Sequence, residues 1–94
     1  MKNSILQPMT PKQCYLCGRQ FGLEVHHIWA GVANRRISDA NGFWVYLCSF
    51  CHRSKGGAQY NNELNQKLKA ECQQEFEKTH TREEFMKLIG KNYL

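Results

Sequence analysis

The chain has 94 residues, of which 41% are hydrophobic and 22% are charged, so we expect one small globular domain and not a disordered chain. Its longest apolar run, residues 43–48, is far shorter than the ~20 residues of a membrane-spanning helix. The N-terminus also lacks the apolar segment of a secretion signal, and we therefore expect a cytoplasmic protein with no membrane partner.

Positive charge is concentrated in one part of the sequence. Residues 1–58 carry the whole net charge of +5, whereas residues 59–94 are neutral. The basic part also holds four of the five cysteines and three of the four histidines. This asymmetry indicates a polyanionic partner, most simply nucleic acid, and the alternative is a basic surface that only maintains solubility.

The first half of the chain predicts an arm and two short strands. Residues 1–13 hold both prolines and are expected to form a flexible N-terminal arm. Alternating apolar residues predict a strand over 22–27, and aromatic and β-branched residues predict its partner over 43–47. Residues 30–42, with two glycines and two asparagines, are expected to form a polar loop, and a brief helical turn is expected after Cys51.

The last third of the chain predicts two amphipathic helices. In the first, apolar residues recur at every fourth position from Tyr60 to Phe76, and Asn61 or Asn62 can cap its start. Cys72 lies on this apolar stripe and is expected to be an inert buried thiol.

The second helix is predicted by its boundary signals. Thr81-x-x-Glu84 is a capping box, and Gly90 can end the helix. We expect residues 60–94 to act as a scaffold or as a dimer contact, and in the second case the protein is a homodimer through its C-terminal helices.

Four cysteines form two C-x2-C pairs, Cys14 with Cys17 and Cys48 with Cys51, separated by thirty residues. Two such pairs can close a tetrahedral zinc site, and a structural Zn2+ would compensate for the small core of so short a chain. A redox role is the alternative for a single pair, but two pairs in a chain without an export signal favour zinc.

The three remaining histidines of the basic half suggest a second, open metal site. His26 and His27 end the first predicted strand, and His52 directly follows Cys51. Since four cysteines already complete a zinc site, the histidines are expected to converge beside it and leave room for a substrate. The alternatives are that His26 and His27 are surface or packed core residues, and that His52 replaces one cysteine on the zinc.

The runs CYLCG, LEVHHI and LCSFCHRSK, within residues 14–56, resemble the zinc-bearing HNH endonucleases, especially the small ones of phages and prophages. The resemblance implies an α+β fold whose nuclease core, residues 14–59, is of the ββα-metal (His-Me finger) type. In that core a hairpin and a helix hold one catalytic divalent ion, and a four-cysteine zinc site holds the core together. Two C-terminal helices would then follow in the same domain.

By this resemblance His26 and His52 correspond to the catalytic metal ligands, and His27 to the general base. The four cysteines correspond to the zinc ligands. The family's middle asparagine usually stands five residues before the second cysteine pair, where this chain has Phe43. The nearest substitutes are Asn34 and Asn41, of which we expect Asn41 to serve.

These roles suit phosphodiester hydrolysis. An imidazole titrates near neutral pH and can take a proton from water, while a divalent ion stabilises the charge that develops on the phosphate. Mg2+ prefers oxygen ligands, whereas two imidazoles favour Mn2+, Ni2+ or Zn2+. Asp39 or Glu24 can add an oxygen ligand, although the spacing does not require either.

The expected function is thus metal-dependent DNA endonuclease, acting on double-stranded DNA with weak sequence specificity. Residues that can hold flanking phosphates are Arg35, Arg36, Arg53 and Lys55. The principal alternative is a zinc-containing nucleic-acid-binding module without catalysis. A third hypothesis is a zinc-dependent interaction protein that docks through its C-terminal helices, but it leaves the histidines unexplained.

Overall fold

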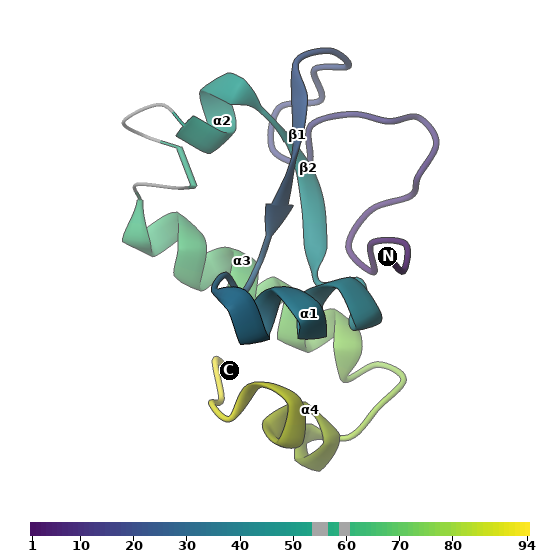
Figure 1. Ribbon diagram of the computed structural model, residues 1–94, viewed down its shortest axis with the longest axis vertical. Coiled ribbons are helices and arrows are strands. Elements are labelled where there is room, and N and C mark those ends of the chain that lie inside the picture. The colour runs from purple at the N-terminus through teal and green to yellow at the C-terminus, as the bar shows by residue number, and fades with distance from the viewer. Residues whose placement is uncertain (54–56, 59–60) are drawn as a thin grey trace.

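The computed structural model describes residues 1–53, 57–58 and 61–94. Within these ranges it confirms an α+β fold with a two-stranded antiparallel sheet (Figure 1). The elements in chain order are β1 (Leu23–His27), α1 (Val32–Asn41), β2 (Trp44–Cys48), α2 (Ser49–Arg53), α3 (Asn62–Phe76) and α4 (Arg82–Ile89). The predicted strands are confirmed to within one residue, and the helical turn expected after Cys51 begins earlier and contains it.

The register of the two strands places the histidines at one end of the sheet and Cys48 at the other. His27 lies opposite Trp44 and His26 opposite Val45, while Leu23 at the other end lies opposite Cys48. Residues 43–45 and 47–48 are buried, so β2 is the more deeply buried of the two strands. The other strand, β1, carries side chains that line a cavity. Because α2 follows β2 directly, Cys48 and His52 are separated by one short helical segment.

The segment expected to be a polar loop, residues 30–42, is instead mostly helix α1. Ser38 is the only buried residue of this helix. Because no apolar side chains recur along a buried face, the sequence lacks the periodicity that predicts a helix. The helix is held by Ser38 Oγ, which donates to the Trp29 carbonyl at 3.1 Å. Gly42 ends it in the left-handed conformation, where its N–H donates to the Ser38 carbonyl at 2.9 Å.

The N-terminal arm has no regular secondary structure, yet it is tied to the hairpin and to α1. The backbone N–H of Lys2 donates to the Asp39 carbonyl at 2.8 Å, and that of Ile5 to the Gly42 carbonyl at 3.0 Å. The arm runs beside the outer edge of β2 (Figure 1), where Gln7 Oε1 accepts from the Tyr46 N–H at 2.7 Å. The arm therefore contributes polar contacts to this edge of the sheet, where the Tyr46 carbonyl also accepts from the backbone N–H of Tyr15 at 2.8 Å.

The C-terminal helices pack onto this hairpin. Their boundaries are as expected: Asn61 caps α3, Thr81 and Glu84 form the capping box of α4, and Gly90 ends it. None of the described helices is long and apolar enough to cross a membrane.

The core is aromatic and draws on both halves of the chain. Its buried members from α3 and α4 include Leu68, Phe76 and Phe85, and the ring of Phe43 packs against those of Phe76 and Phe85. The apolar stripe predicted for the first helix is thus covered within the chain itself, although Tyr60 lies outside the described residues. Cys72 is fully buried, as expected, and burial together with the negative charge of Glu75 raises the pKa of its thiol.

Candidate functional site

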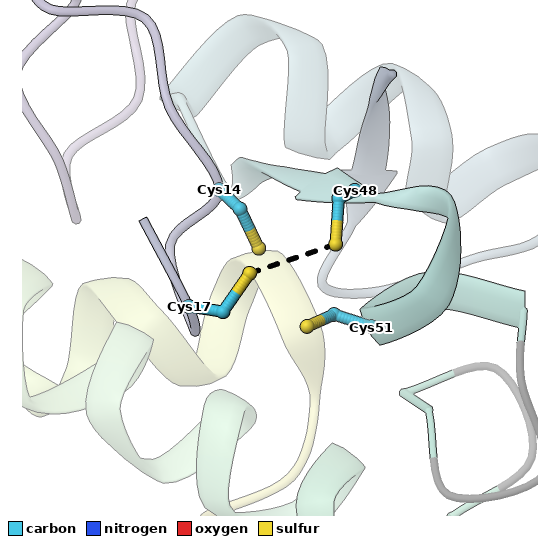
Figure 2. Close-up of side chains that lie close together, drawn as sticks. All are labelled: Cys14, Cys17, Cys48 and Cys51. Carbon is cyan, nitrogen blue, oxygen red and sulfur yellow. Dashed lines mark hydrogen bonds between the residues drawn. The ribbon is translucent and has the colours of Figure 1, made fainter. Parts of the chain in front are cut away.

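The four cysteines of the two C-x2-C pairs converge on one point (Figure 2). Their sulfur atoms all lie within 4.8 Å of one another, and the Cys17 and Cys48 sulfurs are 3.6 Å apart. Four sulfurs at ~2.3 Å from a tetrahedral Zn2+ would be separated by ~3.8 Å, so the observed spacing fits such an ion. These residues are positioned to bind a metal, and all five cysteines of the chain are free thiols.

Local backbone geometry brings the two pairs together. The first pair lies in a turn in which the Gly18 N–H donates to the Cys14 carbonyl at 2.9 Å, and Gly18 has the positive φ of 81° that the turn requires. The second pair spans the end of β2 and the start of α2. Gly57 packs so closely over Cys51 that a Cβ there would lie 2.7 Å from the Cys51 carbonyl oxygen.

The surroundings shift the thiol pKa values of two of the four cysteines in opposite directions. Burial opposes the thiolate of Cys14, but backbone N–H groups directed at its sulfur, chiefly that of Cys48, lower its pKa to about 6. Burial and the neighbouring sulfurs raise the pKa of Cys51. Four thiolates this close repel one another, and a divalent cation among them would remove that repulsion.

The three histidines of the basic half line a single cavity of about 380 Å³. His26 and His27 reach it from β1 and His52 from α2, and the ring centroids of His26 and His52 are 5.1 Å apart. None of the three belongs to the cysteine cluster. The structure therefore brings the histidines together as a separate group, with His52 outside the four-cysteine cluster.

His26 is the most deeply buried of the three, with 9% of its surface exposed. Its Nε2 atom has no hydrogen-bond partner in the described part of the chain. Burial first, and then the positive charges nearby, lower its pKa to about 4, so the ring is neutral at neutral pH. A neutral imidazole with an unpaired buried nitrogen is a group that a metal ion can satisfy.

His52 is oriented by a carboxylate. Its Nδ1 lies 2.9 Å from Glu24 Oε1, and since a carboxylate only accepts, Nδ1–H donates to it, which makes Nε2 the lone-pair nitrogen of the neutral form of the ring. The hydrogen bond from His52, and then the contact with Arg53, lower the pKa of Glu24. This is the carboxylate–histidine arrangement that commonly fixes the ring of a metal ligand.

His27 is oriented by a different carboxylate. Its Nε2 lies 2.8 Å from Asp39 Oδ1, which comes from the last turn of α1. Nε2–H therefore donates to Asp39, and Nδ1 is the atom that accepts a proton when the ring is neutral. The arrangement is that of a general base held by an acidic partner.

Of the basic residues expected to hold phosphates, only some lie at the histidine cavity among the described residues. Arg35 lines the histidine cavity, whereas Arg36 is exposed and does not line it. Arg53 forms two hydrogen bonds with Glu24, so its guanidinium is already paired with a carboxylate. Lys55 lies outside the described residues.

Asn41 is not brought to the cavity. Its side chain donates to the Ile37 carbonyl at 2.9 Å, and it lines two hollows on another side of the molecule that also contain Phe76 and His80. The expectation that Asn41 supports the base is therefore not supported by the geometry. The reason is the helix: two residues along α1 change the side-chain direction by more than half a turn, so Asp39 faces His27 and Asn41 does not.

Glu24 and Asp39 were expected at most as additional metal ligands, and the structure instead pairs them with His52 and His27. Asn65 and Lys69, which also line the cavity, were not expected at the site. Glu24 had a usable signal, because residues two apart on a strand share a face and it stands two before His26. Asp39 had none, since the helix that presents it was not predicted. Asn65 and Lys69 reach the cavity from α3, which lies in the neutral C-terminal segment that was expected to act as a scaffold or a dimer contact.

Comparisons of the chain with models of protein families, with curated proteins and with solved structures find no match. The function is therefore inferred from the cysteine cluster, the histidine cavity and the side chains that contact them.

Proposed function

We propose that this protein is a metal-dependent endonuclease that hydrolyses phosphodiester bonds in DNA. In this proposal β1, β2 and α2 form a ββα-metal core of the HNH type, and the four cysteines hold a structural Zn2+. The observation that carries the proposal is the cavity in which His26, His27 and His52 meet, two of them oriented by carboxylates from other elements.

His26 and His52 are the residues that would hold the catalytic divalent cation. The buried, unpaired Nε2 of His26 supports this assignment. The contact of His52 Nδ1 with Glu24 also supports it, because it leaves Nε2 of the neutral ring as the nitrogen that would bind the cation. When bound there, the cation supplies positive charge for the phosphate oxygens and the leaving 3′ oxygen. Imidazole ligands favour Mn2+, Ni2+ or Zn2+, while Mg2+ would need additional oxygen ligands.

His27 would act as the general base. Its Nδ1 takes a proton from a water molecule as the water oxygen forms a bond to phosphorus and the bond to the 3′ oxygen breaks. The hydrogen bond from Nε2–H to Asp39 fixes the tautomer and stabilises the imidazolium that results. Solvent water then protonates the 3′ oxygen, which leaves a 5′ phosphate and a 3′ hydroxyl.

Arg35 would contact the phosphate backbone, since it lines the same cavity and carries a fixed positive charge. Arg53 is less suited to this role because Glu24 already neutralises it. Contacts of this kind position DNA without reading its sequence, which supports weak sequence specificity.

A supercoiled-plasmid cleavage assay tests the proposal. Protein carrying one zinc per chain is stripped of weakly bound ions and supplied with Mg2+, Mn2+, Ni2+ or Zn2+. We expect ion-dependent cleavage, and we expect His27→Ala to reduce its rate at least about 100-fold. The matched control is His80→Ala, since His80 is exposed and outside the cavity, and it should cleave as the wild type does.

Absence of cleavage with every ion would overturn the nuclease. If the same protein still binds DNA in a salt-dependent way, the non-catalytic zinc-containing binding module would take its place. Equal loss in His27→Ala and His80→Ala would show that His27 has no special role.

A further inference from the structure

The histidine cavity has a second wall that comes from α3. Asn65 and Lys69 both line it, and since they are four residues apart they lie on the same face of the helix. The cavity is therefore bounded by the hairpin and α2 on one hand and by a C-terminal helix on the other. A molecule that enters it to reach the histidines also meets α3.

Lys69 has no acidic partner in the part of the chain that the structure describes. It belongs to none of the ion pairs found there, and the positions three and four residues away along α3 hold no carboxylate. Lys67, two positions earlier and exposed, differs in this respect because Glu63 and Glu71 stand four residues to either side of it. Lys67 thus has the pattern of an ordinary helix-surface lysine, and Lys69 does not.

The head group of Lys69 is supported by the C-terminal tail. Its Nζ lies 5.6 Å from the centroid of the Tyr93 ring, within the range of a cation–π contact. The Tyr93 ring packs against Trp29 at 5.6 Å, and its backbone N–H donates to the fully buried Gln73 at 2.7 Å. The tail that holds the lysine is therefore itself anchored in the core.

The placement of Lys69 calls for an anion. A lysine that shares a cavity with a pair of cation-binding imidazoles repels any cation held there, unless a negative group lies between them. A phosphate group satisfies this requirement, since its oxygens can face both a metal ion and an ammonium group.

We propose that Lys69, with Asn65 beside it, binds a phosphate group of the nucleic-acid substrate on the α3 side of the cavity. This inference rests on the proposed function and deepens it, because it makes the C-terminal helices part of the substrate site. The ammonium group of Lys69 supplies the charge, and the side-chain amide of Asn65 donates a hydrogen bond. Tyr93 is a positioning residue for Lys69.

Steady-state cleavage of a short DNA duplex over a range of salt concentrations tests the inference. We expect Lys69→Met to raise KM about tenfold and to change kcat less than about threefold, since a phosphate contact acts mainly in binding. The slope of log(kcat/KM) against log salt should become shallower by about 0.9, the loss of one phosphate contact. Lys69→Arg should stay within about threefold of the wild type, and Lys67→Met, the matched control, should not change either parameter.

Equal behaviour of Lys69→Met and Lys67→Met, with wild-type cleavage intact, would overturn the role of Lys69 and leave the nuclease standing. Equal loss in Lys69→Met and Lys69→Arg would also overturn it, because a charge-dependent contact should survive in the arginine variant. If Lys69→Met loses zinc or helix content, Lys69→Gln carries the same expectations with a polar head group. Failure of the wild type to cleave would overturn both proposals together.

Discussion

The cysteine cluster and the histidine cavity lie in the same small fold but are assembled in different ways. The cysteines come as two local pairs, each held by a turn or a helix start, and a single hairpin brings the pairs together. The cavity instead collects side chains from β1, α1, α2 and α3. A site made of local pairs can be recognised from residue spacing, whereas a site made of single residues from four elements requires the fold.

Loss of the cysteine cluster should unfold the chain, whereas changes in the cavity should affect activity or the second metal ion. We expect Cys48→Ser to lose the zinc and to leave the chain unfolded, because structural zinc contributes on the order of 10 kcal/mol in small domains. Metal analysis and circular dichroism measure both effects.

Cys72→Ala is the matched control for this variant, since Cys72 is as deeply buried as Cys48 but outside the cluster. It should keep one zinc per chain and its helix content. A folded, zinc-containing Cys48→Ser protein would contradict the structural role of the cluster.

Asp39→Asn tests whether Asp39, which contacts His27 in the structure, supports the base in place of the asparagine expected from the sequence. We expect kcat for DNA cleavage to fall about 10- to 100-fold with little change in KM, because Asp39 holds the tautomer of His27 and need not touch the substrate. Asn41→Ala, at the asparagine expected to substitute for the one that the motif lacks here, should leave kcat unchanged since Asn41 lies outside the cavity. The reverse result would restore Asn41 as the residue that supports the base.

Glu24→Gln tests the orientation of His52 without removing the ring. We expect the affinity for Mn2+ to fall about 10- to 100-fold, as is typical when the carboxylate partner of a ligating histidine is changed, while the zinc content stays at one. Isothermal titration calorimetry measures the affinity, and Glu83→Gln on the exposed side of α4 serves as the control. Equal affinities in the two variants would remove Glu24 from the account.

Gly42→Ala tests how firmly α1 must be held for Asp39 to reach His27. Gly42 and Gly90 each end a helix with positive φ, 75° and 84°, but only at Gly42 would a Cβ collide with a backbone carbonyl, that of Asn3. Both alanine variants should lose about 1 kcal/mol for the backbone conformation, and Gly42→Ala should lose at least about 1 kcal/mol more for the collision. Equal denaturation midpoints would show that the N-terminal arm yields freely.

Much of the fold could be predicted because its signals are local. The strands follow from aromatic and β-branched runs, and the caps of α3 and α4 from single side chains such as Asn61 and Thr81. Helix α1 could not be predicted, because its stability comes from a buried serine and from contacts with the N-terminal arm and not from an apolar stripe.

The candidate site divides along the same line. The cysteines and histidines stand out by type and spacing, and the structure brings each group together. Their partners do not stand out: Asp39 depends on α1, and Lys69 lies 17 residues beyond His52 on another helix, α3. Glu24 is intermediate, because strand alternation alone places it on the face of His26.

Native mass spectrometry in the presence of Mn2+ measures whether the chain holds two metal ions, one in each cluster. We expect one tightly bound zinc and one exchangeable Mn2+ in the wild type. His26→Ala should carry the zinc alone, while His80→Ala should carry both ions. A wild-type protein that binds only the zinc, or a His26→Ala protein that still binds the second ion at the same Mn2+ concentration, would show that the histidine cavity is not a metal site.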